Sequence, residues 1–87
     1  MLQVYAVFDK AVGAFAQPIF VRSRGEALRS FMQAVSADGS QMGRFAADYE
    51  LHQLAEYDDQ TGEFKNIGQR VLTALEASVS RETVVDT

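Results

Sequence analysis

The stretch from Tyr49 to Lys65, YELHQLAEYDDQTGEFK, places the strongest limit on the fold. Apolar and polar residues alternate through its first half, which is typical of a strand with one buried face. The DDQTG segment then offers a glycine for a positive φ angle, and EFK returns to a strand pattern. A hairpin is therefore predicted, with Phe64 turned inward. The residues expected to share one face of its first strand are Tyr49, Leu51, Ala55 and Tyr57.

The acidic residues around Gly62 raise two other interpretations, a calcium loop and an acid/base site. With Gly62 at the sixth position of an EF-hand loop, Tyr57 and Gly68 would take the first and last ligand positions, and neither has a carboxylate. Paired catalytic carboxylates need a shared cleft, whereas these acids lie in a predicted exposed turn. The turn interpretation is therefore preferred.

The chain has no cysteine and a single histidine. Disulfides, thiolate chemistry and cysteine-ligated metals are therefore excluded. His52 lies on the predicted strand, where a solvent-facing or partner-facing role is favoured over a catalytic base. No serine nucleophile or phosphate-binding glycine loop stands in a recognisable setting. We expect no catalytic residue, no metal site and no cofactor, and hence a protein that is not an enzyme.

The N-terminal region also reads as a hairpin. LQVYAVFD alternates as a strand does, DKAVG supplies turn residues, and FAQPIFVRS forms a second strand. Pro18 has no amide hydrogen, which indicates an edge strand or a bulge. Both strands carry bulky apolar residues on both faces. Leu2, Val4, Ala6 and Phe8 should share one face of the first strand, and Tyr5 and Val7 the other.

Two helices are predicted. Ser23 and Glu26 have the S-x-x-E spacing of a capping box, and Gly39 suits the left-handed end of the helix that they begin. Its apolar stripe is Ala27, Leu28, Phe31, Met32 and Val35. A second helix over residues 67–79 is predicted from a weaker stripe, with Asn66 as its cap. That stripe is Ile67, Val71, Leu72, Leu75 and Val79.

The element order is then β-β-α-β-β-α. The predicted fold class is α+β, an antiparallel sheet of about four strands with one face covered by the amphipathic helix. With 87 residues the chain suits one domain, over residues 1–80, followed by a disordered tail at 81–87. The first ten residues lack a signal-peptide pattern, and no apolar run is long enough for a membrane span.

The uncovered face of such a sheet needs a use, and we expect it to carry Tyr5, Val7 and Phe20. A chain this short is marginal as a monomer, so burial against a second copy, as a homodimer or small homo-oligomer, is the favoured interpretation. Stacking of nucleobases on the aromatic side chains is the alternative. The residues assigned to the oligomer interface are Tyr5, Val7, Phe20 and Leu54.

The net charge of −4 is unevenly spread, with +2 over residues 1–46 and −6 over residues 47–87. A basic first half can mark a surface for an anionic partner, but +2 is a small charge for a nucleic-acid-binding domain, and a solvated surface is the favoured interpretation. The candidate nucleic-acid-binding residues are Lys10, Arg22, Arg24, Arg29, Arg44, Tyr5 and Phe20. One continuous basic face would favour DNA. Dispersal, or pairing with acids, would favour a protein interaction module.

The chain resembles the small nonstructural protein of gokushovirus-type microviruses, which are single-stranded DNA phages. The resemblance covers residues 1 to about 65 and rests on YAVFD, on SADG and above all on DYELHQLAEYDDQTGEF. The family has a similar D-Y-x-L-x-x-(I/L)-(G/A)-x-(Y/F)-D-x-x-T-G signature. Its positions here are Asp48, Tyr49, Leu51, Leu54, Ala55, Tyr57, Asp58, Thr61 and Gly62.

The resemblance implies an accessory protein in the cytoplasm of an infected bacterial host, outside the capsid shell. It implies binding to single-stranded DNA, or to phage or host replication proteins, in genome replication or packaging. It brings no catalytic residues. The alternative is a dimeric protein–protein interaction module without nucleic-acid contact, which the sequence pI of about 4.7 favours.

Overall fold

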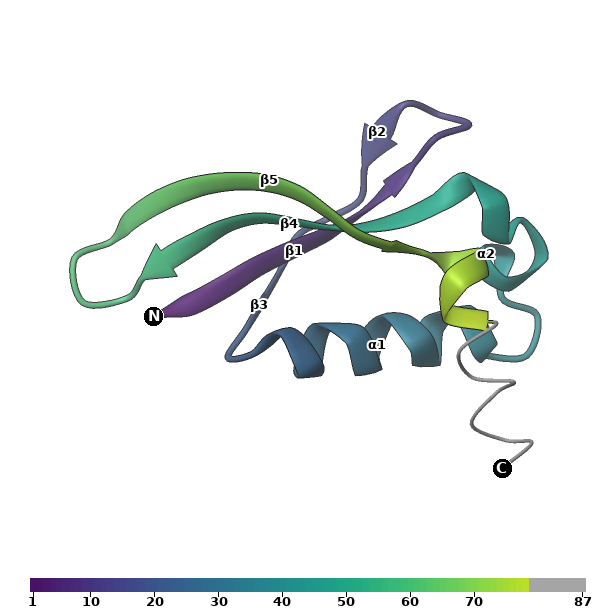
Figure 1. Cartoon of the computed structure of the whole chain (residues 1–87), viewed down its shortest axis with the longest axis horizontal. Coiled ribbons are helices and arrows are strands. Elements are labelled where there is room, and N and C mark those ends of the chain that lie inside the picture. The colour runs from purple at the N-terminus through teal and green to yellow at the C-terminus, as the bar shows by residue number, and fades with distance from the viewer. Residues whose placement is uncertain (79–87) are drawn as a thin grey trace.

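The computed structural model describes residues 1–78, and these form an antiparallel sheet with one long helix against one face. The predicted α+β class is confirmed (Figure 1). The element order departs from the predicted one in the divided second strand, in two short helical segments after the long helix and in the segment after Lys65. The elements are β1 (Leu2–Asp9), β2 (Ala14–Phe15), β3 (Ile19–Val21), α1 (Arg24–Ser36), α2 (Gln41–Arg44), the 3-10 helix η1 (Ala46–Asp48), β4 (Tyr49–Asp58) and β5 (Glu63–Thr73). Residues 74–78 are helical.

The strand order is β2-β1-β4-β5, and β3 also pairs with β1. β2 and β3 are therefore two parts of one edge, where a single second strand was predicted. Pro18 lies in the interruption between them and has no amide hydrogen to donate. The predicted edge position of this proline is confirmed.

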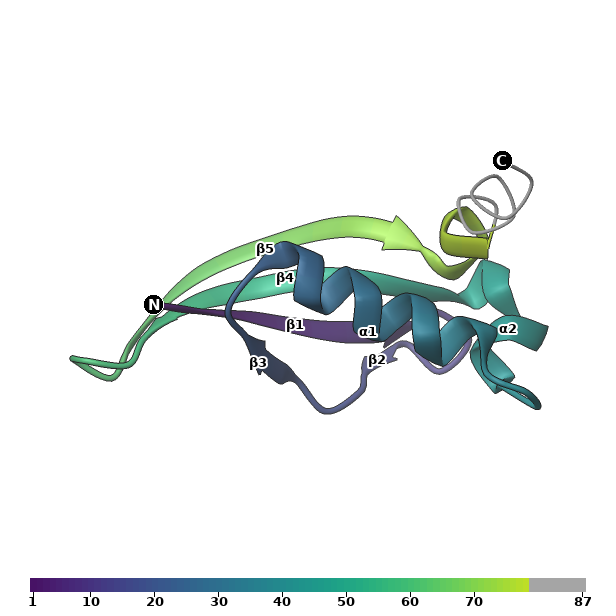
Figure 2. The same cartoon turned by 90° about the horizontal axis from the view of Figure 1, so that it is seen from below.

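Helix α1 begins as the capping-box spacing predicts. The Ser23 hydroxyl accepts a hydrogen bond from the Glu26 amide at 3.2 Å. The Glu26 carboxylate accepts one from the Arg22 amide at 3.0 Å, one residue earlier than the usual reciprocal partner. The buried stripe Ala27, Phe31 and Val35 packs against the sheet over β1 and β4. Figure 2 shows the helix lying across this face.

The predicted assignment of the two sheet faces is wrong for β1. Tyr5 has no exposed surface and lies in the core with Phe31 and Leu51, and Val7 packs against the same cluster. The Tyr5 hydroxyl donates to Gln3 Oε1 at 2.6 Å, so its buried ring keeps a polar partner. Burial raises the pKa of Tyr5, and Arg24 partly opposes this. Alternation separates two faces of a strand, but the packing of α1 decides which face is covered.

A bulge in β4 also changes the predicted face of its second half. The pairing with β1 shifts between Val4 and Tyr5, and Leu54 is the extra residue. Leu51 therefore points toward α1, whereas Ala55 and Tyr57 point to the other face. The prediction that Leu51, Ala55 and Tyr57 share a face is wrong because a one-residue insertion reverses the alternation.

The predicted helix over residues 67–79 is wrong up to Thr73, because this segment is the long strand β5. Asn66 lies within the strand opposite Ala55 and caps no helix. Helix begins only at residue 74, where the Thr73 hydroxyl accepts from the Glu76 amide at 3.0 Å and Glu76 accepts from the Thr73 amide at 3.2 Å. Position 79 and the predicted tail at 81–87 lie outside the described residues.

The two hairpins are closed by turns of the same form, D-x-x-x-G. The Gly13 amide donates to the Asp9 carbonyl and the Gly62 amide to the Asp58 carbonyl, both at 2.7 Å. Both glycines have positive φ angles, 76° and 79°. The Asp9 carboxylate also accepts a hydrogen bond from the Ala11 amide at 3.0 Å, and the Asp58 carboxylate accepts one from the Gln60 amide at 2.9 Å. The turn interpretation of DDQTG is thus confirmed.

Candidate binding surface on the uncovered sheet face

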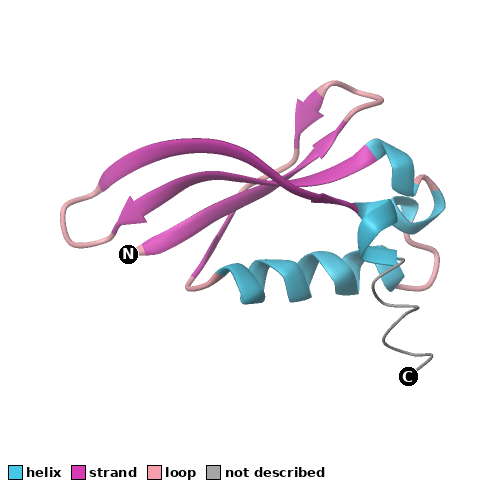
Figure 3. Ribbon diagram, viewed as in Figure 1, coloured by secondary structure: helices cyan, strands magenta, loops and turns pink. Residues whose placement is uncertain are grey.

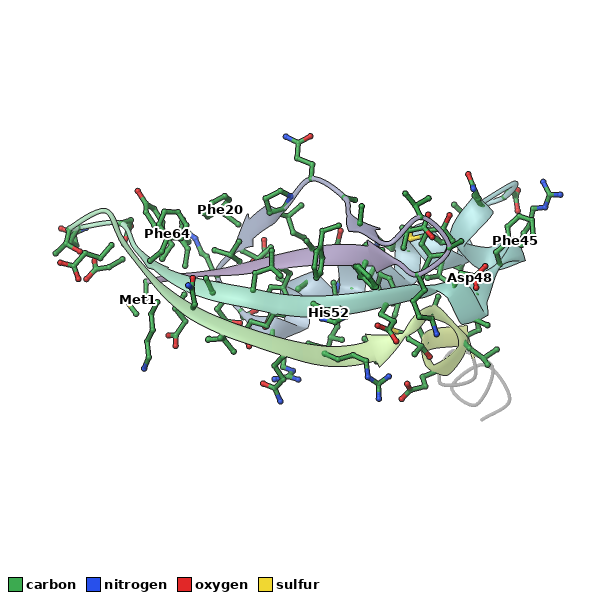
Figure 4. All side chains as sticks on the ribbon, turned by 90° about the horizontal axis from the view of Figure 1, so that it is seen from above. Met1, Phe20, Phe45, Asp48, His52 and Phe64 are labelled. Atoms are coloured by element: carbon green, nitrogen blue, oxygen red, sulfur yellow. The ribbon has the colours of Figure 1, made fainter. Side chains whose placement is uncertain are left out.

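The face of the sheet opposite α1 carries no helix of the described residues and gathers aromatic side chains along its length. Figure 3 shows the helical segments below the sheet and at one end, and Figure 4 looks onto the open face. The strand register brings these aromatic side chains together, because Phe8 is paired with Phe15, Val4 with Phe20, and Tyr57 with Phe64. Directly opposite residues share a face, so the rings form two groups.

The first group, here called the distal cluster, consists of Phe20, Tyr57 and Phe64 near the β4–β5 turn. The ring centroids of Phe20 and Tyr57 are 5.6 Å apart, those of Tyr57 and Phe64 4.7 Å, and those of Phe20 and Phe64 6.2 Å. Phe64 is 57% exposed and Phe20 48%. Phe64 was predicted to turn inward, and this is wrong. Three strands thus bring together a large apolar surface that water contacts.

The second group, the proximal cluster, consists of Phe8, Phe15 and His52 near the β1–β2 turn. Phe15 lies 4.8 Å from Phe8 and 5.2 Å from His52 between ring centroids, and Phe15 is 48% exposed. His52 Nε2 is 3.0 Å from Glu50 Oε1, and Lys10 Nζ is 3.8 Å from Glu50 Oε2. His52 therefore lies among aromatic rings with one carboxylate partner.

The two ends of the face differ in their charges, and the distal end is acidic. Beside the distal cluster the β4–β5 turn presents Asp58, Asp59 and Glu63, and Asp59 lies 3.5 Å from the N-terminal ammonium. Amide hydrogen bonds from Gln60 and Thr61 hold the pKa of Asp58 below its usual value.

Beside the proximal cluster the charges form pairs of opposite sign. The Lys10 side chain is 46% exposed, whereas its partner Glu50 is only 15% exposed and lies beneath it. Arg70, directly opposite His52 in the register, is 51% exposed and bonds to Glu76 at 3.1 Å. Glu76 is itself 57% exposed, so the face is acidic at one end and carries paired charges of both signs at the other.

The predicted nucleic-acid-binding residues do not form one surface. Lys10 and Phe20 lie at opposite ends of the uncovered face, and Tyr5 is buried beneath α1. Arg22 follows β3, Arg24 begins α1 and Arg29 lies on the exposed side of that helix. Arg44 lies in α2 at the far end, with its guanidinium carbon 5.5 Å from the centroid of the Phe45 ring.

The predicted oligomer interface is also divided. Tyr5 and Val7 pack against α1, while Phe20 lies on the other side of the sheet. Leu54 is the half-buried extra residue of the β4 bulge. Only Phe20 of these four is an exposed apolar residue.

Several residues of the uncovered face were not predicted as site residues: Phe8, Phe15, Glu50, His52, Tyr57, Phe64 and Arg70. A signal for four of them was present in the sequence. Phe8 and Phe15 are the second pair of residues counted outward from the β1–β2 turn. Tyr57 and Phe64 are the second pair counted outward from the β4–β5 turn. Such positions must face each other across a hairpin. The bulge and the packing of α1 then decide which face they share.

A cavity of about 100 Å³ lies between α1 and the interrupted edge of the sheet. Its lining includes Tyr5, Ile19, Phe31, Met42 and Leu51 and offers no carboxylate, imidazole or amine. Among residues 1–78 no three histidine or acidic side chains are grouped so that they could hold a metal ion. Within the same residues, no helix has the length and apolar character to cross a bilayer.

Comparison with known proteins gives one match. A family model described as "Phage ORF5 protein" matches residues 2–77, which is nearly all of the described chain. No curated protein and no solved structure matches the chain.

Proposed function

Because the chain belongs to the Phage ORF5 protein family, we propose that it is a non-enzymatic phage accessory protein that binds another macromolecule through the uncovered face of its sheet. The observation that carries the proposal is the aromatic surface itself: Phe15, Phe20 and Phe64 are each about half exposed on one face. Contiguous apolar surfaces of this kind mark binding sites in soluble proteins. The DYELHQLAEYDDQTGEF signature supports a gokushovirus-type microvirus and, with it, the cytoplasm of the infected bacterium as the place of action.

A protein partner is the favoured occupant. The basic residues of the first half are dispersed over both ends and both sides of the molecule, and Lys10 is paired with Glu50. The most exposed phenylalanine ring, that of Phe64 in the distal cluster, lies beside the acidic β4–β5 turn. A phosphate backbone is repelled by such a turn, whereas a protein with apolar and basic side chains is not.

Single-stranded DNA is the second candidate, which one specific observation favours. The proximal cluster places the exposed ring of Phe15 beside His52, with Lys10 and Arg70 nearby. Stacking of bases on aromatic rings together with cationic contacts to phosphates is the physical basis of single-strand binding. This candidate would connect the protein directly to genome replication or packaging.

Fluorescence anisotropy with a labelled single-stranded oligonucleotide of about 16 nucleotides, a site size reached by single-strand binders, tests the second candidate. Salt-sensitive binding that Phe15→Ser and Arg70→Ala abolish would establish DNA as the ligand. The matched control is Phe45→Ser, since Phe45 is 50% exposed in a different part of the surface. Absence of binding at low salt by the folded wild-type protein would exclude DNA.

Co-purification of bound proteins tests the favoured candidate, a protein partner. The tagged protein is expressed together with the other proteins of its phage, and captured proteins are compared for wild type, Phe64→Ser, Phe15→Ser and the control Phe45→Ser. We expect the partner to be lost with both face variants and retained with the control. Equal capture by all four chains would contradict a role for the uncovered face.

A further inference from the structure

The inference in this subsection rests on the proposed function and names a partner for the uncovered face. We infer that the face is occupied by a second copy of this chain, packed face to face with its strands reversed end for end. In this arrangement the distal cluster of each copy (Phe20, Tyr57, Phe64) lies on the proximal cluster (Phe8, Phe15, His52) of the other. The interface is isologous, because each copy contributes the same surface.

The first argument is the amount of apolar surface that the single chain leaves in water. The core between the sheet and the helices includes the small residues Ala27, Ala74 and Ala77, so its apolar volume is limited. Three of the four phenylalanine rings that are about half exposed, Phe15, Phe20 and Phe64, lie on the opposite side of the sheet, and the fourth is Phe45. The core of a chain of 87 residues gives only marginal stability to the monomer. A second copy would bury these rings and add apolar burial.

The second argument is that the face is complementary to itself in charge. Its distal end carries the acidic β4–β5 turn with Asp59 exposed, and at its proximal end Lys10 is more exposed than its partner Glu50. Reversing one copy end for end brings the acidic turn of each chain to Lys10 of the other. A copy placed with the two turns at the same end would set acid against acid, which is unfavourable.

Packing of two sheets through one face each is physically ordinary. Sheets stack about 10 Å apart with their strand directions within about 30° of each other, and interlocking side chains fill the space between them. Aromatic side chains at the centre, with charged residues at the rim, are the usual composition of a protein interface. The uncovered face has this composition, with its rings along the strands and its charges at the two turns.

Light scattering during size-exclusion chromatography, over a range of loading concentrations, gives the first test. We expect the mass of two chains at high concentration and of one chain on dilution. Phe64→Ser should weaken dimerisation by at least about tenfold, as loss of a central aromatic residue does. The control Phe45→Ser should leave the wild-type dissociation constant unchanged. Circular dichroism confirms that each variant is folded.

A charge exchange tests the orientation of the two copies. One variant carries Asp59→Lys and a second carries Lys10→Glu; Asp58 is left intact because its carboxylate accepts the Gln60 amide in the turn. Each variant alone sets like charges against each other at both ends, so we expect monomers. An equal mixture restores opposite charges at both ends, so we expect dimers to reappear.

Three outcomes would overturn the inference. They are a wild-type chain that is monomeric at every concentration, a dimer that Phe64→Ser leaves intact, and a mixture that stays monomeric. A wild-type chain that is monomeric at every concentration would leave the proposed function standing. That function fails separately, if capture of phage proteins and binding of the oligonucleotide are both unaffected by the face variants.

Discussion

At the scale of the residue, one of the acids that first suggest a calcium or catalytic site, Asp58, has a structural role. Asp58 accepts the Gln60 amide at 2.9 Å and its carbonyl accepts the Gly62 amide at 2.7 Å, which closes the β4–β5 turn. Asp9 does the same in the β1–β2 turn. The sequence motif is thus explained by turn geometry, and the acidic charge that it leaves on the surface is available for the interface.

Asp58 gives a prediction for the pH dependence of stability. Amide hydrogen bonds hold its pKa in the folded protein below the unfolded value of about 3.9. Its contribution is therefore fully present above about pH 4 and is lost as the pH falls through the folded pKa. We expect urea unfolding to show a fall in stability below about pH 4 that is smaller in Asp58→Asn. The comparison variant Asp59→Asn removes a charge from the same turn but not the acceptor of the Gln60 amide. Equal pH profiles for wild type and Asp58→Asn would contradict this role.

At the scale of the element, local signals predicted α1 well and the segment after Lys65 badly. α1 has a side-chain cap and a buried stripe with helical spacing, and both are satisfied by residues close in sequence. Residues 67–73 also have helical spacing, but the β-branched Ile67 and Val71 favour a strand, and Gly68 weakens a helix and has a positive φ angle of 65° where the register with β4 shifts. Pairing with β4 satisfies the backbone of this segment, and no residue within the segment specifies that partner.

The true start of the last described helix gives a second prediction. Thr73 and Glu76 form a reciprocal capping box, and hydrogen bonds from Thr73 together with Arg70 lower the pKa of Glu76. Removing the hydroxyl in Thr73→Ala should cost about 1 kcal/mol of stability, the usual cost of losing such a cap. Thr73→Ser keeps the hydroxyl and should stay close to wild type. Urea unfolding of the three proteins checks this, and an equal loss in both variants would mean that the methyl group, rather than the cap, matters.

At the scale of the whole molecule, the sheet has one face packed on α1 and one face lined by aromatic rings, and the distal end of that second face is acidic. No single element has this arrangement. The distal cluster needs three strands in register, and the proximal cluster needs both the β1–β2 hairpin and β4. The proposed binding face is therefore a property of the assembled sheet.

This arrangement gives a third prediction. If the uncovered faces of two copies pack together, folding and association are coupled, and the thermal midpoint should rise with protein concentration. Differential scanning calorimetry over a wide concentration range checks this for wild type. Phe64→Ser should show a lower midpoint that no longer depends on concentration. A wild-type midpoint that stays constant over that range would contradict the coupling.

The sequence by itself determined what depends on near neighbours: the two turns, the cap and stripe of α1, the edge position of Pro18 and the α+β class. The tertiary structure alone decided which face of the sheet α1 covers, where the Leu54 bulge reverses the alternation of β4, and that residues 67–73 pair as a strand. The physical reason is that short-range hydrogen bonds and steric limits are encoded within a few residues. Side-chain faces and strand partners, in contrast, are selected by packing between segments that are far apart in the chain. For this reason the candidate binding surface, apart from Phe20 and Lys10, emerged only from the structure.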